Sequence, residues 1–139
     1  MAAHGKIDLG VPLMDEDHAR IDELLDAARC MPDEDLPALC AAVTMEVREH
    51  FKREEDFLRD RSFPGLFCHV AQHKVLLADL TRAGAGRGAA LRRQMESIIP
   101  QLIQSHVTTM DGMAAAFLKG ELQASEFDIL RLPLPESVG

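Results

Sequence analysis

The stretch from residue 50 to residue 74 carries two polar pairs, each four residues apart: His50 with Glu54 and His69 with His73. Residues four apart in an α-helix differ by about 40° and lie one turn above each other. One helix therefore presents an imidazole and a carboxylate on one face, and the next presents two imidazoles. This is ligand spacing for a transition metal such as iron, zinc or manganese. A single pair of this kind is more often a surface accident, so the remaining histidines decide between the two interpretations.

The spacing of apolar residues predicts that most of the chain is helical. Apolar side chains recur at steps of three and four, as in helices that bury one face. The predicted helices run from about residue 15 to Pro32, from an acidic cap at residues 33–35 to a turn at residues 61–65, over about residues 66–83, and over about residues 89–118. Four helices with short connections are typical of an up-down bundle. We therefore expect an all-α fold, an antiparallel up-down four-helix bundle.

Segments outside these patterns define the expected organisation. We expect an N-terminal arm over residues 1–14, the bundle over residues 15–119, and a C-terminal tail over residues 120–139. Within the tail, residues 125–130 are predicted to form a short helix and residues 132–139 irregular chain. Pro100 lies inside the fourth helical pattern and should kink or split that helix, because proline lacks a backbone donor and clashes with the preceding turn.

The composition excludes several classes of partner. The chain has 139 residues, of which 47% are apolar, so one domain with an apolar core is expected. The formal net charge of −8 argues against nucleic acid or an anionic membrane surface as the main partner. No run of 18 apolar residues occurs, so no membrane-spanning helix is expected.

The three cysteines indicate a reducing compartment. Cys30, Cys40 and Cys68 are odd in number and far apart, and no C-x-x-C motif occurs. We expect reduced, mostly buried thiols in the cytoplasm, and the N-terminus lacks the apolar segment of a secretory signal. Cys68 is not expected to bind the same metal as His69, because adjacent helical residues point about 100° apart.

Five of the six histidines fall on faces that are predicted to be buried: His18, His50, His69, His73 and His106. Each buried imidazole needs partners for its ring nitrogens, so five in one small bundle are unfavourable unless something binds them. They exceed the ligand number of one tetrahedral zinc ion, but they suit two metal ions that share bridging carboxylates. Glu54, one helical turn from His50, is a candidate bridge.

A second bridging carboxylate is harder to select from spacing. Asp111 follows His106 by five residues, which is about 140° around an ideal helix. It can join the site only through a local distortion of the helix or a side chain that wraps from the flank. Asp111 is not part of the inward stripe predicted for the fourth helix, which consists of Ile99, Ile103, His106, Met110, Met113 and Phe117.

The order of these residues resembles the hemerythrin family, particularly its bacterial single-domain members. The resemblance covers about residues 10–119: His18, then His50-Phe51-x-x-Glu54-Glu55, then His69-x-x-x-His73, then His106-Val107-x-x-x-Asp111. An acidic lead into His18 and a Phe-Pro turn before His69 also agree with the family. The fold implied is the same antiparallel four-helix bundle.

The resemblance implies a non-heme di-iron centre with a divided set of ligands. His69, His73 and His106 would hold one iron, and His18 and His50 the other. The carboxylates of Glu54 and Asp111 would bridge the two ions, with an oxo or hydroxo group as a third bridge. The two-histidine iron would keep an open position, where dioxygen binds in the family as both irons pass from ferrous to ferric.

Residues around this implied centre partly follow the family. Ile103 and Val107 match the wall of the ligand pocket, and both are apolar here. Family members often carry a Trp four residues before the fourth-helix histidine and a Tyr three residues after the bridging aspartate. This chain has Leu102 and Ala114 at those positions, and Pro100 is also unexpected. These departures concern pocket tightness and the rate of autoxidation and leave the ligands unchanged.

The resemblance implies reversible dioxygen binding, for storage, delivery or sensing, rather than an enzyme. A sensor would need a separate signalling partner, and NO, azide or other small anions could occupy the same open position. Two alternatives remain: an NO-binding or iron-handling protein, and a peroxide-consuming or oxidising di-iron enzyme. Enzymes of that kind are rich in carboxylates and E-x-x-H pairs, which this chain lacks. Zinc in place of iron and a bundle without metal are further alternatives.

Overall fold

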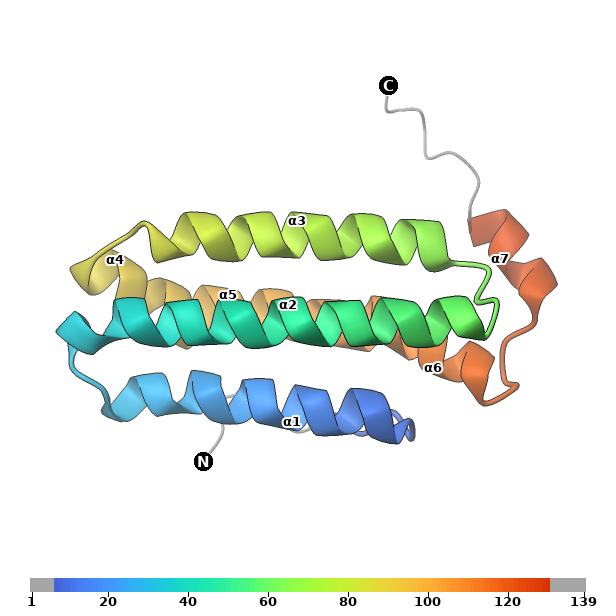
Figure 1. Ribbon diagram of the computed structural model, residues 1–139, viewed down its shortest axis with the longest axis horizontal. Helices are drawn as coiled ribbons and strands as arrows, with labels where there is room; N and C mark the ends of the chain where they lie inside the picture. Colours follow the sequence, from blue (N-terminus) through green and yellow to red (C-terminus); the bar gives the residue numbers. More distant parts are fainter. Residues whose placement is uncertain (1–6, 131–139) are drawn as a thin grey trace, which may run out of the picture.

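Four antiparallel helical rods form the body of the protein in a computed structural model that describes residues 7–130 (Figure 1). The first three rods are α1, α2 and α3, and the fourth rod, residues 88–118, lies behind α2 in this view. A shorter helix, α7, lies across one end. The helical segments are α1 Pro12–Ala27, η1 Ala28–Cys30, η2 Asp33–Asp35, α2 Leu36–Asp60, α3 Leu66–Gly84, α4 Gly88–Arg93, η3 Gln94–Ile98, α5 Ile99–His106, η4 Val107–Asp111, α6 Gly112–Leu118 and α7 Ala124–Leu130.

This architecture confirms the predicted all-α bundle, and no strand occurs in residues 7–130. The first helix begins at Pro12 rather than near Asp15, because proline's fixed φ and missing donor suit the first helical turn. The Asp15 carboxylate instead accepts hydrogen bonds from the backbone N–H groups of Leu9 at 2.9 Å and Gly10 at 3.1 Å. The short helix predicted over residues 125–130 is confirmed as α7, whereas residues 132–139 lie outside the described part of the chain.

The turn after α2 is a Schellman motif that positions an aromatic ring. Ser62 adopts a positive φ of 55°, and its N–H donates to the Arg59 carbonyl at 3.0 Å. The N–H of Phe63 donates to the Leu58 carbonyl, also at 3.0 Å, and both side chains are buried in one cluster. The motif ends α2 and directs the Phe63 ring toward His69 on α3, with ring centroids 6.0 Å apart.

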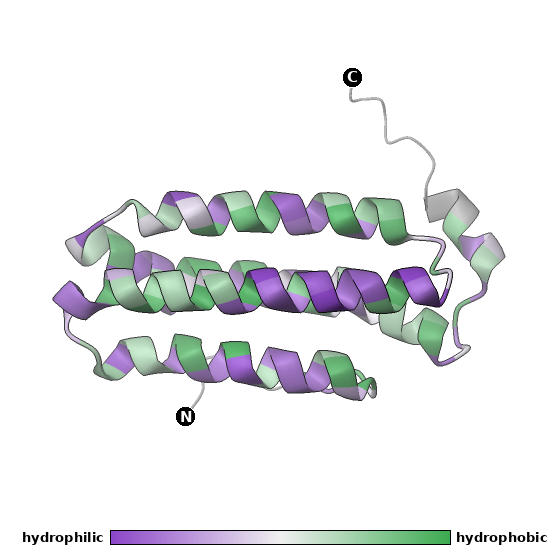
Figure 2. Cartoon of the chain, viewed as in Figure 1, coloured by the Kyte–Doolittle hydropathy of each residue, from purple (hydrophilic) through white to green (hydrophobic). Residues whose placement is uncertain are grey.

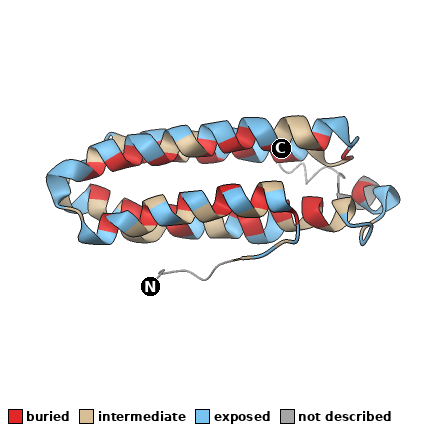
Figure 3. Ribbon diagram, turned by 60° about the horizontal axis from the view of Figure 1, so that its bottom comes forward, coloured by how far each residue is buried: buried red, intermediate tan, exposed pale blue. Residues whose placement is uncertain are grey.

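Two apolar clusters occupy the interior, one on each side of a polar layer. Buried residues line the facing sides of the rods (Figure 3). On α2 the larger cluster takes the N-terminal half as far as Phe51, and the smaller one takes Leu58. Where the two clusters meet on α2 lie the buried side chains of His50 and Glu54. Figure 2 shows this change as a hydrophobic first half and a hydrophilic second half of α2.

The fourth rod contains two π-helical turns, η3 and η4, and continues as a helix through both. Its inward side chains recur every four residues: Leu91, Met95, Ile99, Ile103, Val107, Asp111 and Ala115. In an α-helix each step of four residues rotates the stripe by about 40°, so six steps would rotate it by about 240°. A π-turn accommodates one extra residue, worth about 100°. The two π-turns therefore keep this stripe on the core side.

These π-turns also bear on two expectations. Pro100 lies in the first turn of α5, one residue after η3 ends at Ile98, so the rod changes its hydrogen bonding beside this proline; the predicted kink stays a prediction. Met110, Met113 and Phe117, which were expected on the inward stripe, are only partly buried, although Met113 and Phe117 pack against the smaller apolar cluster. Asp111 and Ala114 are fully buried instead.

Two further sequence expectations have different outcomes. Cys40 is buried, but Cys30 and Cys68 are exposed, so the prediction of mostly buried thiols is wrong for two of the three. No helix in residues 7–130 combines the length and apolar character needed to cross a bilayer.

Candidate metal centre

The structure brings all seven predicted ligands together in the polar layer between the two apolar clusters. Every rod contributes: α1, α2, α3 and the fourth rod each supply at least one ligand atom. All seven side chains are buried, and the two carboxylates are fully enclosed. Their ligand atoms form two groups, each within 4.8 Å: Glu54, His69, His73, His106 and Asp111 in one; His18, His50, Glu54 and Asp111 in the other.

Glu54 belongs to both groups because its two oxygens face in different directions. Its Oε1 lies 2.8 Å from Nε2 of His69 and 3.1 Å from Nε2 of His73, both on α3. Its Oε2 lies 3.4 Å from Nε2 of His50, one turn earlier on α2. The carboxylate thus spans from the three-histidine group to the two-histidine group.

Asp111 divides its oxygens in the same way. Its Oδ1 lies 2.9 Å from Nε2 of His69 and 3.1 Å from Nε2 of His106. Its Oδ2 lies 3.0 Å from Nε2 of His18 on α1. The η4 turn makes this possible, since five residues of a π-helix complete about one turn and bring Asp111 back to the face of His106.

The close contacts within the cluster fit metal ions. Several buried ligand atoms lie near another ligand atom but lack the geometry of a hydrogen bond in the described chain, among them His50 Nε2, His73 Nε2, His106 Nε2 and Asp111 Oδ1. Metal–nitrogen bonds of about 2.1 Å place adjacent ligands of an octahedral ion about 3 Å apart. The nitrogen–oxygen distances of 2.8–3.4 Å match that spacing. The residues present can therefore hold two cations that share two carboxylates.

Burial and the neighbouring side chains act in opposite directions on the charges of this cluster. Burial lowers the pKa of His50, but the hydrogen bond to Asp17 and the nearby negative charge of Glu54 outweigh it and raise that pKa to about 9. Burial likewise opposes protonation of His69, whose pKa is raised to about 9 by hydrogen bonds to Asp111 and Glu54. Burial also works against ionisation of both carboxyls, yet the surrounding imidazoles hold the pKa of Glu54 and of Asp111 below their usual values. The enclosed carboxylates are thus anions that require positive charge nearby.

Comparison with known proteins agrees with this geometry. The family model described as the hemerythrin HHE cation binding domain matches residues 9–118. The chain belongs to the hemerythrin family. It is also 29% identical over 113 residues to a bacteriohemerythrin of Ralstonia nicotianae, an alignment that covers 79% of this chain and 82% of that protein. No solved structure matches the chain significantly.

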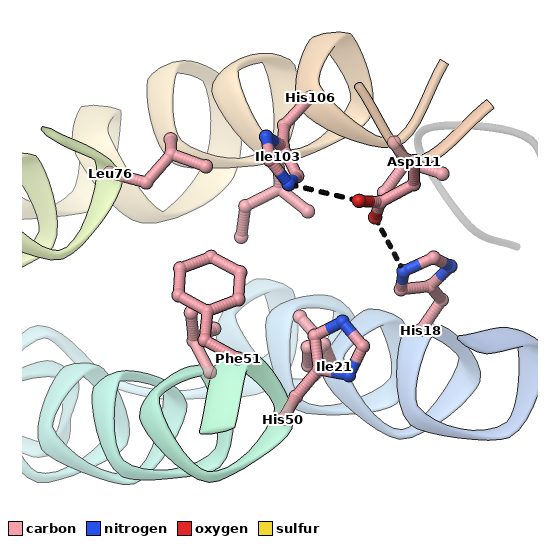
Figure 4. A pocket seen from close by; sticks show the side chains of 10 residues that line it. His18, Ile21, His50, Phe51, Leu76, Ile103, His106 and Asp111 are labelled. Atoms are coloured by element: carbon pink, nitrogen blue, oxygen red, sulfur yellow. Dashed lines mark hydrogen bonds and ion pairs between the residues drawn. The ribbon is translucent and has the colours of Figure 1, made fainter. Parts of the chain in front are cut away.

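A small cavity borders the two-histidine group of this hemerythrin domain (Figure 4). It has a volume of about 10 Å³, roughly the space of one water molecule. His18, His50 and His106 form its polar side, and both predicted wall residues, Ile103 and Val107, line it. The rest of the lining is mostly apolar: Ile21, Val47, Phe51 and Leu76, with Asp111.

Two further carboxylates, which helical spacing does not select, hold the outer nitrogens of two of the five histidines. Nδ1 of His50 donates to Oδ2 of Asp17 at 2.8 Å, and Nδ1 of His73 donates to Oε2 of Glu55 at 2.7 Å. Asp17 also accepts from Arg53 at 3.1 Å, and after the opposing effect of burial these contacts lower its pKa to about 2. Such partners fix the ring orientation and the tautomer of a metal-binding histidine. The only signal in the sequence was an acidic neighbour beside a predicted ligand.

Phe51 holds the ring of His73 from the apolar side. It stacks on His73 with ring centroids 3.6 Å apart and planes 2° from parallel. It also borders the cavity beside His18 and His50. The same residue therefore orients a histidine of one group and closes the space beside the other.

Proposed function

We propose that this hemerythrin domain binds dioxygen reversibly at a di-iron centre. The observation that best supports this proposal is that each of the two buried carboxylates belongs to both a three-histidine group and a two-histidine group. His69, His73 and His106 would hold one iron, His18 and His50 the other, and Glu54 and Asp111 would bridge them. Two iron ions supply the two electrons that reversible dioxygen binding requires.

The protein's own residues would control access to the open position. The two-histidine group has one ligand fewer than its neighbour, and the small cavity lies on its side. Ile103 and Val107 keep this space apolar, which disfavours the entry of water and the loss of a reduced oxygen species. Asp17 and Glu55 hold the rings of His50 and His73 in the orientation that presents Nε2 to the metal.

The size of this cavity bears on the alternatives. A space of about 10 Å³ admits a diatomic molecule with small adjustments of the wall, but it does not admit an organic substrate. A substrate-oxidising enzyme is therefore less well supported than a gas-binding protein. NO has the same size as dioxygen and remains the second candidate ligand. The expected role in storage, delivery or sensing, the cytoplasmic location and any signalling partner remain predictions.

The test is a visible absorption spectrum of the iron-loaded chain, with iron content measured on the same sample. We expect two iron ions per chain and a colourless form after anaerobic reduction. Exposure to air should give a stable coloured species, and removal of oxygen should restore the colourless form. Direct passage to a ferric spectrum with no lasting oxygenated form would overturn reversible binding and favour NO binding or redox chemistry.

A further inference from the structure

A second, larger cavity lies on another side of the centre, beneath α7. We call it the α7 cavity, and its volume is about 160 Å³. Two phenylalanines and two methionines form most of its wall, and Gly65, Cys68 and His69 complete it: Phe63, Phe127, Met110, Met113, Gly65, Cys68 and His69. Cys68 is exposed, so the cavity borders the surface near the start of α3. His69 is the one proposed iron ligand in the lining described for this cavity.

His69 presents an unpartnered nitrogen to this side of the centre. Its Nε2 lies 2.8 Å from Oε1 of Glu54 and 2.9 Å from Oδ1 of Asp111. The side chain of His69 is almost fully buried, and its Nδ1 has no hydrogen-bond partner in the described chain. The edge of the His69 ring that remains to face the cavity therefore carries Nδ1, whose N–H can donate a hydrogen bond.

Other histidines of the centre show what is missing. His50 and His73 each donate their outer N–H to a carboxylate, Asp17 and Glu55. Metal-binding histidines almost always have such an acceptor, and leaving a buried donor unpaired is unfavourable. His69 borders a cavity large enough to supply one from a bound molecule. The Nδ1 atoms of His18 and His106 are also unpaired, but these two residues line the small cavity and not the α7 cavity.

The lining restricts the chemistry of a guest. An apolar cavity of about 150 Å³ is known to hold a benzene-sized molecule. Phenylalanine rings and methionine sulfur make favourable contacts with aromatic rings. A charged guest would be strongly disfavoured in the iron-loaded protein, because His69 would then be a neutral metal ligand and no other charged side chain among the described residues lines the cavity to compensate for desolvation.

We propose that the α7 cavity binds a neutral, single-ring aromatic molecule with a carbonyl oxygen, which accepts a hydrogen bond from Nδ1–H of His69. The ring lies between Phe63, Phe127 and the methionine side chains. The acceptor makes the imidazole a stronger donor to the metal, so the guest adjusts the centre from outside the ligand set. Occupancy of the cavity does not depend on iron, whereas the effect on the centre rests on the proposed function.

The first test compares two probes of nearly the same shape by calorimetric titration of the iron-loaded protein. Acetophenone carries the carbonyl oxygen, and α-methylstyrene has a CH2 group in its place. We expect one acetophenone per chain, bound about three- to tenfold more tightly than α-methylstyrene, as one neutral hydrogen bond provides. The visible spectrum should shift with acetophenone only. Equal affinities would overturn the role of His69, and absence of binding by both probes would overturn the site.

Variants then locate the binding. Met113→Trp fills the cavity and should weaken acetophenone binding at least tenfold, and Met110→Phe serves if the first variant fails to fold. Met45→Trp is the matched control, because Met45 is 56% exposed on α2 and does not line the cavity. Unchanged binding in both cavity variants would refute the location. A chain that holds no iron but still binds acetophenone would fail the proposed function and leave the cavity assignment intact.

Discussion

The π-turn η4 explains how Asp111 reaches the centre, and deletion of one residue tests this explanation. Thr109 is exposed and lies inside η4. Without it, the turn should become α-helical, and the histidine and aspartate would then be four residues apart. Four residues in an α-helix leave them about 40° apart on the same face. Removal of Thr109 should therefore keep both ligands and the helix phase beyond them.

Deletion of Ser105 is the matched control, because this residue is also exposed but precedes His106 in α5. The histidine would move back by one position, which rotates it about 100° and shifts its Cα by about 3.8 Å. Ligands must stay within about 0.5 Å of the productive geometry, so this shift should remove His106 from the site. Both deletions leave every loop at its original length.

The assay is the number of iron ions per chain after reconstitution and desalting, with helix content followed by circular dichroism. We expect two ions for the Thr109 deletion and a loss of at least one for the Ser105 deletion, with similar helix content. If the Thr109 deletion loses metal as completely as the Ser105 deletion, the π-turn is needed for more than accommodating an extra residue. The extra residue of η4 would then not explain how Asp111 reaches the centre.

Three substitutions test other parts of the structure. Ile103→Thr should speed autoxidation of the oxygenated form several-fold by admitting water to the small cavity. Leu102→Thr, at the neighbouring surface position, should leave the autoxidation rate unchanged. If stopped-flow measurements give the two variants equal autoxidation rates, Ile103 is not part of the cavity wall. Asp17→Asn should weaken iron binding by about tenfold or more, because the His50 ring loses a charged acceptor, and chelator competition that finds wild-type affinity would contradict this orienting role. Ser62→Gly should raise the free energy of unfolding by about 0.5–1 kcal/mol, since glycine relieves the positive φ at a smaller entropic cost; denaturant unfolding that shows a loss of stability would mean that the Ser62 side chain contributes more than its backbone strain.

The histidines were the most predictable part of the centre. Each of the five lies on a regular apolar stripe, so spacing alone places it on an inward face. Spacing alone did not select Asp111, because an ideal helix turns it about 140° away from His106. Only the family resemblance supplied it in advance, and η4 provides the physical reason. The same extra residue explains why Met110 was wrongly expected on the inward stripe.

The carboxylates that orient the histidine ligands were harder to predict from the sequence. Asp17 and Glu55 each lie one position beside a ligand, where helical periodicity points a side chain away from the ligand's own face. They reach the centre because a neighbouring helix brings a histidine to them: His50 from α2 and His73 from α3. Contacts of this kind depend on how helices are placed against one another, which a stripe on a single helix does not encode.

Because every rod donates to one polar layer, bound metal would act as a covalent cross-link does between distant parts of the chain. His18 and Asp111 lie 93 residues apart in sequence, and both belong to the two-histidine group. Closing a loop of that length with a disulfide restricts the unfolded chain by about 4–5 kcal/mol on the chain-entropy scale. An ion that joins α1 to the fourth rod would impose a similar restriction, so chelation should make the whole bundle easier to unfold and to digest. Metal supply would then govern the lifetime of the chain as well as its ability to bind gas.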